Sequence, residues 1–363
     1  MGVYHTVNRK KHKKGFTTGA CVAAAAKASV MMLYNRNKIF KVTIDTPSGL
    51  NLTLPISDIS LFEQSAECAV TKDGGDDPDV TTGLKIFAKV RINSNNNISI
   101  NAGEGVGIVT LPGLKIPVGK PAINPVPMEM IKKEVREVLP DGMGADIVVR
   151  IPGGEEIAKK TYNPKLGIRG GISILGTKGI VEPMSQEAWK EALSLEIDVA
   201  AAKGIKELYF TFGNHGRDFV KDEFGIGDEY IITMSNFVGF MLDKALENNI
   251  KKVVVVGHMG KLIKVSAGIF NTHSSVADAR MEILVAYAAL EGAPKDLTHR
   301  IYECKTTDAA ADIIDRYGIT KVYEKIAENT VRRCSQHVFN KIEISAVLFK
   351  EDKDKGTVLL SQK

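Results

Sequence analysis

The chain has 363 residues, more than one ordinary hydrophobic core covers, so we expect two domains. Hydrophobic residues make up 44% and charged residues 25% of the sequence, as in ordinary globular proteins. The formal net charge of +5 is too small for a dedicated nucleic-acid binder, but it suits an acidic small-molecule partner.

The cysteines, the apolar runs and the basic N-terminal run each argue against a further class of protein. The four cysteines are far apart and include no CxxC pair, so neither a zinc site nor a disulfide framework is indicated and a reducing cytoplasm is expected. The apolar runs, such as "VVVVG" at 253–257, are too short to cross a membrane. The basic run from Arg9 to Lys14 is interpreted as a solvated tail rather than a nucleic-acid arm.

The first half of the chain predicts an α+β domain over residues 1–184. A helix should begin near Thr18 and continue to about Asn35, because threonine is a good N-cap and the alanines that follow are the best helix formers. A second helix is expected over 128–139. Short strands are expected at 39–45, 50–56, 66–72, 84–92 and 145–151.

The segment 152–184 is rich in glycine, and helices are improbable there. Such a segment is either a long functional loop with short strands or a domain connector. It carries several basic residues, among them Arg169, and an arginine in a glycine-rich loop suits bidentate binding of carboxylates. The alternative is an ordinary surface loop.

In the second half, residues 185–363, apolar strands alternate with helices, which predicts an α/β domain with a Rossmann-like, mostly parallel sheet covered on both faces. Strands are expected at 207–213, 251–257 and 342–349. Helices are expected near 185–203, 234–248, 275–292, 307–317 and 319–329.

Two of these strands end in glycine motifs, "FGNHGRD" from Phe212 and "VGHMGKLIKV" from Val256. Ligands of parallel sheets bind beyond the carboxyl ends of the strands, so both motifs are candidate ligand loops. The alternative is that the glycines make tight turns and the histidines are solvated. The second motif lacks the spacing of a phosphate-binding P-loop.

The acidic run "KDGGDDPD" at 72–79 does not follow the EF-hand pattern. It is interpreted as a charged hairpin turn. The alternative is that Asp76, Asp77 or Asp79 orients a ligand or pairs with basic residues.

Seven motifs occur in an order that resembles one family. They are "GFTTGACVAAAAKA", "VTKDGGDDPDVTTG", "GEGVGIVTLPGL", "GKPAINPVP", "LGIRGGISILGTKGIVEPMS", "FGNHGRD" and "VGHMGKLIKVSAG". Together they resemble the CbiD family of cobalamin biosynthesis, the cobalt-precorrin-5B C1-methyltransferases. The resemblance runs from about residue 14 to the final helices.

The resemblance implies methyl transfer from S-adenosylmethionine to C1 of a cobalt-bound, ring-contracted tetrapyrrole. It implies a fold distinct from that of the other precorrin methylases. It also implies that cobalt arrives with the substrate, so no protein metal site is expected. The substrate carries acetate and propionate groups, which suits cationic side chains and helix N-termini.

On this basis we assign candidate roles. The residues expected to bind the methyl donor or the adjacent ring edge are Gly213, Asn214, Gly216, Gly257, Gly260 and Lys261. The residues expected to bind substrate are Thr17, Thr18, Arg169, Arg217 and Lys264. If a general base is needed, His215 and His258 are the candidates, because histidine titrates near neutral pH.

Three other functions remain open from sequence. An ATP-dependent kinase or ligase would also place glycine loops after strands, although no complete phosphate-binding motif is present. A corrinoid-binding protein would hold the tetrapyrrole without turnover. An RNA-binding module is disfavoured by the mild charge and the 6% of aromatic residues. The sequence does not reveal the oligomeric state.

Overall fold

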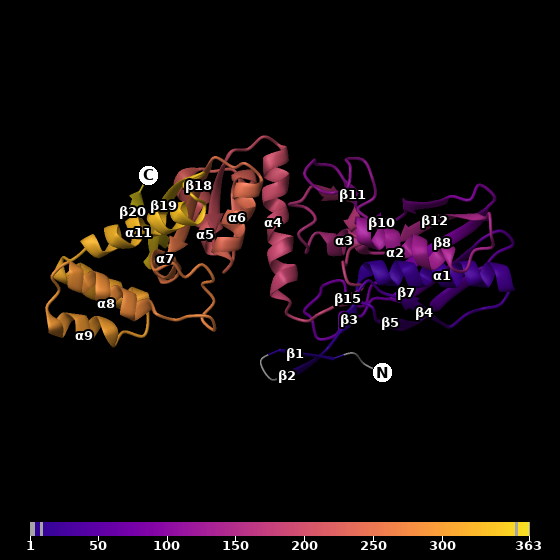
Figure 1. Cartoon of the computed structure of the whole chain (residues 1–363), viewed down its shortest axis with the longest axis horizontal. Helices are drawn as coiled ribbons and strands as arrows, with labels where there is room; N and C mark the ends of the chain where they lie inside the picture. Colours follow the sequence, from indigo (N-terminus) through magenta and orange to yellow (C-terminus); the bar gives the residue numbers. More distant parts are fainter. Residues whose placement is uncertain (1–3, 8–9, 353–354, 363) are drawn as a thin grey trace. The chain divides into compact units, whose positions relative to one another are not determined.

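The computed structural model describes residues 4–7, 10–352 and 355–362 (Figure 1). The chain divides into two compact units, Met1–Gln186 (unit 1) and Glu187–Lys363 (unit 2).

Unit 1 is a mixture of short strands and a few helices. Its strands are β1 (Tyr4–Val7), β2 (Lys10–Lys13), β3 (Gly15–Phe16), β4 (Lys41–Asp45), β5 (Asn51–Pro55), β6 (Ser57–Leu61), β7 (Ala66–Thr71), β8 (Lys85–Asn93), β9 (Ile98–Ala102), β10 (Gly105–Val106), β11 (Ile108–Val109), β12 (Gly144–Arg150), β13 (Ile168–Arg169), β14 (Gly171–Ile172) and β15 (Ile180–Val181). Its helices are α1 (Thr18–Asn35), α2 (Pro125–Arg136) and α3 (Gly154–Ala158).

The main sheet of unit 1 has the strand order β6-β7-β8-β12-β9. Its neighbours pair antiparallel except β12 and β9, which are parallel. Helix α1 contacts β7, β8 and α2, and Figure 1 shows the two helices side by side. The core of unit 1 therefore lies between this sheet and the helix pair.

Helix α1 begins and ends where the sequence predicts. Thr17 is its N-cap, and Arg36 ends it in the left-handed conformation, with φ of 55°. From Thr18 to Ala26 every residue is buried, so the alanine run is a packed helix body with almost no solvent-facing side. Small side chains let the sheet and α2 approach this helix closely.

Two expectations for unit 1 are corrected. Helix α2 begins at Pro125, three residues earlier than predicted. Proline is tolerated in the first turn of a helix, because the N–H groups of that turn have no acceptor within the helix and proline merely lacks one of them. The glycine-rich segment contains the short helix α3, which follows Gly153 in the left-handed conformation.

Unit 2 begins with a long helix and continues as alternating strands and helices. Its strands are β16 (Glu207–Thr211), β17 (Ile231–Thr233), β18 (Lys252–His258), β19 (Glu343–Asp352) and β20 (Lys355–Gln362). Its helices are α4 (Gln186–Ala202), α5 (Asn214–Phe224), the 3-10 helix η1 (Asp228–Tyr230), α6 (Val238–Glu247), α7 (Met259–Ser266), α8 (Arg280–Leu290), α9 (Lys295–Tyr302), α10 (Thr307–Tyr317) and α11 (Lys321–His337).

The sheet of unit 2 has the order β17-β16-β18-β19-β20, and all neighbours are parallel except β19 and β20. Numbered along the chain, this order is 2-1-3-4-5, one of the two common orders of doubly wound sheets. Helix α5 packs on the face that carries Val254 and Val256, while Val253 and Val255, on the opposite face by alternation, are also buried. The mixed α/β character predicted from the sequence is confirmed, and the Rossmann-like assignment stays a prediction.

Three helices of unit 2 differ in extent from the prediction. Helix α6 starts at Val238 and α8 at Arg280, later than expected, and α11 continues to His337. Both glycine motifs prove to be helix starts rather than free loops, because Asn214 opens α5 and His258 caps α7. Among the residues that the structure describes, no helix combines the length and apolar character that a membrane span requires.

Candidate functional site

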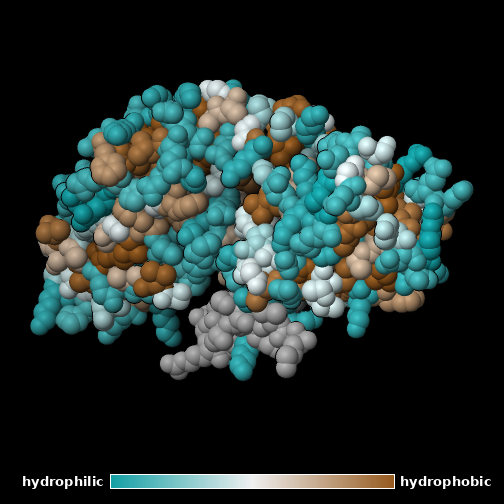
Figure 2. Space-filling view, turned by 45° about the vertical axis from the view of Figure 1, so that its right-hand side comes forward, coloured by the Kyte–Doolittle hydropathy of each residue, from teal (hydrophilic) through white to brown (hydrophobic). Residues whose placement is uncertain are grey.

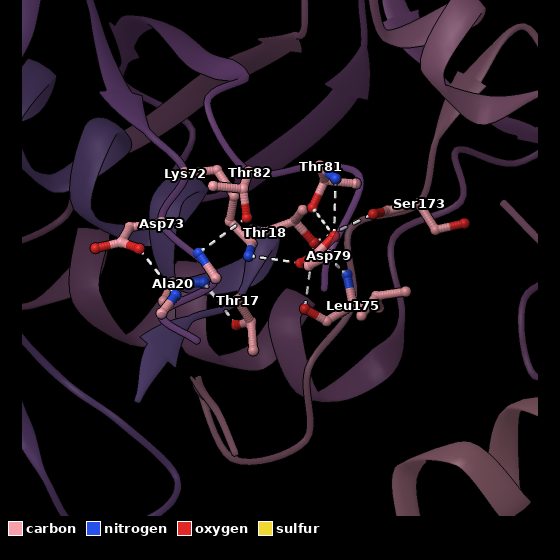
Figure 3. Close-up of polar contacts among 12 residues, drawn as sticks. Thr17, Thr18, Ala20, Lys72, Asp73, Asp79, Thr81, Thr82, Ser173 and Leu175 are labelled. Carbon is pink, nitrogen blue, oxygen red and sulfur yellow. Dashed lines mark hydrogen bonds and ion pairs between the residues drawn. The ribbon is translucent and has the colours of Figure 1, made fainter. Parts of the chain in front are cut away.

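A small pocket in unit 1 joins several of the sequence motifs (Figure 3). Its volume is about 170 Å³. The lining comes from the start of α1, the acidic run and the glycine-rich segment, and consists of Thr17, Thr18, Lys72, Asp79, Val80, Thr81, Thr161, Asn163, Ile172, Ser173, Leu175 and Val181. Pockets for whole small molecules usually exceed about 300 Å³, so this one has room only for part of a large ligand.

An ion pair lies in this pocket. Lys72 is 2% exposed, and its Nζ lies 2.8 Å from Oδ2 of Asp79. The other carboxylate oxygen accepts hydrogen bonds from the backbone N–H and the hydroxyl of Thr81, at 2.8 and 2.6 Å. Burial by itself would raise the pKa of Asp79, but the hydrogen bonds from Lys72 and Thr81 outweigh it and lower that pKa. Asp79 therefore pairs with a basic residue, as one of the two interpretations of the acidic run proposed.

The two threonines of the first motif are already hydrogen-bonded within the chain. The Thr17 hydroxyl accepts from the N–H of Ala20 at 3.2 Å, and it donates to the carbonyl of Gly179. The Thr18 hydroxyl accepts from the N–H of Leu175 at 2.9 Å and donates to the carbonyl of Ser173 at 3.1 Å. The hydroxyls of these two predicted substrate-binding residues are thus engaged within the chain, and they hold the glycine-rich segment against α1.

Two buried polar side chains complete the pocket wall. Asn163 donates to the carbonyl of Gly171 at 2.9 Å, and Ser173 donates to Oδ1 of Asn163 at 3.1 Å. These hydrogen bonds link the two side chains to each other and to the backbone, and so fix their positions in the pocket wall. Sequence reasoning missed both residues, since neither stands out in the glycine-rich segment.

Arg169 lies outside the pocket lining. It belongs to β13, is exposed, and precedes Gly170, whose φ of 79° turns the chain toward β14. Within the described residues, its guanidinium has no hydrogen-bond or ion-pair partner. It is therefore available to an anionic ligand.

One group of carboxylates in unit 1 could approach a common cation. The oxygens of Asp45, Glu134 and Glu137 lie within 4.8 Å of one another. Two lysines already stand among them, because Lys27 contacts Glu134 at 2.6 Å and Lys133 contacts Asp45 at 2.8 Å. The cluster is explained by these ion pairs, which fasten α1 and β4 to α2.

In unit 2, the carboxyl ends of neighbouring strands bring both glycine motifs to one edge of the sheet. β16 leads into Gly213, which supplies no capping side chain to α5 and has open space on its Cβ side. Gly216 lets α5 approach Thr211, since a Cβ there would come within 3.1 Å of the threonine. Gly257 leaves room for Phe212, and Gly260 leaves room for Thr307. At this edge the glycines let neighbouring segments pack closely, and the first turn of α5 is left without a capping side chain. Asn214 and His215 lie exposed in the first turn of α5.

His258 is fully engaged at the start of α7. Its Nδ1 accepts from the N–H of Gly260 at 3.1 Å, and its Nε2 lies 2.9 Å from Oδ1 of Asp308. An Nδ1 that accepts carries no proton, so Nε2–H donates to Asp308. The geometry gives this histidine a capping role, and a general-base role would require one of these bonds to break.

Lys261 stands in the first turn of α7 without an acidic partner in the described part of the chain. Its Nζ donates to Oδ1 of Asn236 at 2.8 Å. Burial, followed by the positive charges of Lys264 and Arg280, lowers the pKa of Lys261 below its usual value. Asn236, which follows β17, is a site residue that sequence reasoning missed, because only the fold brings it to this edge.

The other two predicted basic site residues hold the fold together. Arg217 is 6% exposed, and it donates to Asp228 at 2.9 Å and to Thr233 at 3.0 Å. Lys264 is 3% exposed, and it donates to the carbonyl of Ala277 at 2.8 Å. Neither side chain is available to a ligand in this arrangement.

Comparison with known proteins finds one family in two parts of the chain. CbiD matches residues 5–183, and the C-terminal domain of CbiD matches residues 271–361. A relative named cobalt-precorrin-5B C(1)-methyltransferase from Alkaliphilus metalliredigens is 48% identical over 349 residues, 96% of this chain and 93% of the relative. Another of that name from a Thermoanaerobacter species is 50% identical over 350 residues, 96% of this chain and 95% of the relative.

One solved structure is similar. It is a crystal structure of the cobalamin biosynthesis protein CbiD from Archaeoglobus fulgidus, with 26% sequence identity and a TM-score of 0.40. The match covers 76% of this chain and 87% of that chain.

The Lys72–Asp79 pair generates a stability prediction. Lys72→Met leaves the Asp79 carboxylate without its cation, and we expect a loss of about 3 kcal/mol in the free energy of unfolding. Adding Asp79→Asn removes the unpaired negative charge, so the double variant should regain at least half of the lost free energy of unfolding, as measured by urea denaturation. Lys85→Met is the control, because the exposed Lys85–Asp58 pair should contribute less than about 1 kcal/mol. Equal losses for the two lysine variants would contradict a structural role for the buried pair.

Asp228 generates a pH prediction. Burial opposes ionisation, but hydrogen bonds from Lys221 and Arg217 lower the pKa of Asp228 to about 2. A carboxyl group with a lowered pKa stabilises the fold fully above about pH 4, and this contribution is lost as the pH falls toward about 2.

The gap in melting temperature between wild type and Asp228→Asn should therefore narrow as the pH falls from about 5 to about 2.5. The gap should be modest at neutral pH, because the Asp228 side chain is 50% exposed and solvent screens it. Asp222→Asn, an exposed change on α5, is the control and should show no such trend. A gap for Asp228→Asn that stays constant with pH would refute the linkage.

Proposed function

Because this chain belongs to the CbiD family, we propose that it transfers a methyl group from S-adenosylmethionine to C1 of cobalt-precorrin-5B, giving cobalt-precorrin-6A in cobalamin biosynthesis. The observation that carries the proposal is the identity of 48 to 50% over 96% of the chain to relatives that bear this activity in their names. The cobalt ion arrives with the substrate, which is a small-molecule tetrapyrrole. We place the reaction in a reducing cytoplasm, in keeping with four free cysteines.

We place the methyl donor at the strand edge of unit 2. A ligand with a carboxylate fits Lys261, which lacks an acidic partner among the described residues and stands where a parallel sheet binds its ligand. The uncapped start of α5 at Gly213 adds backbone N–H groups and a favourable helix dipole for the same anion. The positive charge of Lys261 and these backbone N–H groups therefore support the binding of S-adenosylmethionine at this edge.

The chemistry asks the chain mainly for alignment. When bound, S-adenosylmethionine supplies an electrophilic methyl group, and the electron pair of the broken carbon–sulfur bond stays on sulfur. Holding donor and acceptor in line lowers the barrier by several kcal/mol without any protein nucleophile. If a proton must leave the ring, we assign its removal to His215, because its side chain is exposed in the first turn of α5, beside the proposed donor site.

For the substrate, we assign carboxylate binding in unit 1 to Arg169. Its exposed guanidinium is the bidentate type of donor that suits acetate and propionate groups. Thr17 and Thr18 support the segment that carries Arg169 rather than contacting substrate, because their hydroxyls are already bonded to that segment.

Methyl transfer itself is the first test. Incubation with cobalt-precorrin-5B and a donor carrying an isotopically labelled methyl group should place the label on C1, as read by NMR. Under single-turnover conditions, His258→Asn should keep most of the rate, whereas a large loss with His215→Ala would identify a proton-transfer role. No label transfer, together with a higher melting temperature in ATP but not in S-adenosylhomocysteine, would favour the kinase or ligase alternative. Tight corrinoid binding without transfer would favour a binding protein.

The donor and substrate assignments predict that two substitutions, each removing one positive charge, weaken the binding of different ligands. Lys261→Gln should weaken binding of S-adenosylhomocysteine about tenfold and leave the substrate KM near the wild-type value, because a charge-assisted hydrogen bond is lost. Arg169→Ala should raise the substrate KM and leave donor affinity unchanged. Calorimetry and steady-state kinetics on both variants check this pattern. Loss of donor affinity in Arg169→Ala, or unchanged affinity in Lys261→Gln, would overturn the corresponding assignment.

A further inference from the structure

A groove in unit 2 lies away from the strand edge described above. It is formed by the end of α7, by α8 and by α11, which contact one another. Its volume is about 510 Å³, within the range of small-molecule sites. Figure 1 shows α8, together with α9, set off from the sheet of unit 2, so the groove belongs to the helical part of this unit.

The groove contains an arginine that the described part of the chain leaves without a partner. The Nε of Arg333 is buried and makes no hydrogen bond, and no ion pair reaches its guanidinium there. A buried donor that makes no hydrogen bond destabilises the fold, so such groups are rare in folded proteins. Arg333 packs beside Gly268, where a Cβ would lie 3.8 Å from the Arg333 Cδ, an ordinary van der Waals contact.

The rest of the lining combines charge with apolar surface. Arg332 stands beside Arg333 and donates to Asn329 at 2.7 Å, which holds a second positive charge at the groove. On the opposite wall, Leu290 is 74% exposed and Ile283 is half-buried. Figure 2 shows apolar patches among polar side chains on the visible face of unit 2. One carboxylate, that of the exposed Glu282, also lines the groove.

We propose that this groove binds one carboxylate-bearing edge of the tetrapyrrole substrate, with Arg333 as the principal contact. The proposal rests on the proposed function, which supplies a ligand with an apolar ring and peripheral acetate and propionate groups. The guanidinium of Arg333 meets a carboxylate through its two terminal nitrogens, which are not among the buried atoms, in a bidentate geometry that arginine favours. Leu290 and Ile283 contact the apolar ring, and Glu282 disfavours the anion from one side.

The charges of the groove predict opposite effects of neighbouring substitutions. Arg333→Gln should raise the KM for cobalt-precorrin-5B about tenfold with little change in kcat, since a hydrogen bond between charged groups is lost. Arg333→Lys keeps the positive charge but cannot form two parallel hydrogen bonds to a carboxylate, so its KM should lie between those of wild type and Arg333→Gln. Glu282→Gln should lower KM about twofold, because a repulsive charge is removed.

Arg316→Gln is the matched control. It removes one positive charge from the exposed end of α10, outside the groove, and should leave KM unchanged. Melting temperatures of all variants establish that they are folded. Affinity for S-adenosylhomocysteine should equal that of wild type throughout, which separates the groove from the donor site.

A wild-type KM for both Arg333→Gln and Glu282→Gln, in an enzyme that transfers methyl groups, would overturn the groove proposal and leave the function intact. If wild type transfers no methyl group, the proposed function fails, and the groove is tested by absorbance titration with cobyrinic acid and its fully esterified form. Preference for the free acid that is lost in Arg333→Gln supports the groove. Equal binding of acid and ester overturns it.

Discussion

The burial of α1 on nearly all sides is the constraint on which the architecture of unit 1 depends. A helix that water cannot reach must satisfy its first N–H groups from within the protein. The Thr17 hydroxyl accepts from the N–H of Ala20, and the carbonyl of Leu175 accepts from the N–H of Gly19 at 3.2 Å. The glycine-rich segment must therefore pass directly over the helix start. It does so at Gly176, where a Cβ would come within 2.3 Å of Thr17.

This contact also creates the pocket. The segment that passes over α1 contributes Ser173 and Leu175, and the acidic run contributes the ion pair of Lys72 and Asp79 from the other side. Packing and ligand binding are thus not competing explanations of the Thr-Thr-Gly motif. The same hydrogen bonds that complete a buried helix end also fix the position of a pocket wall.

Much of the fold is predictable from sequence because it depends on local patterns. The extent of α1 follows from a threonine cap and a run of alanines, and the buried strand β18 follows from four consecutive valines. The start of α2 was missed because its prolines mask a favourable first turn. The site is less predictable, since Asn163 and Asn236 carry no local signal and reach their sites only through the fold.

The basic residues show why sequence alone cannot separate structural from functional charges. Lys72, Arg217 and Lys264 lie in motifs, yet each is nearly buried and already bonded to acceptors in its own unit. Lys261 and Arg333 carry the same charges and lack an acidic partner in the described chain, which is a property of the three-dimensional arrangement.

A cation that pairs with a carboxylate of the same unit stabilises the fold, because removing the cation leaves a buried carboxylate without a partner. A cation that is desolvated without a counter-charge weakens the fold until an anion binds, so a ligand-binding role accounts for its position. For an enzyme whose proposed substrate carries many carboxylates, this distinction selects Lys261 and Arg333 as contacts for anions and leaves Arg217 and Lys264 to the scaffold.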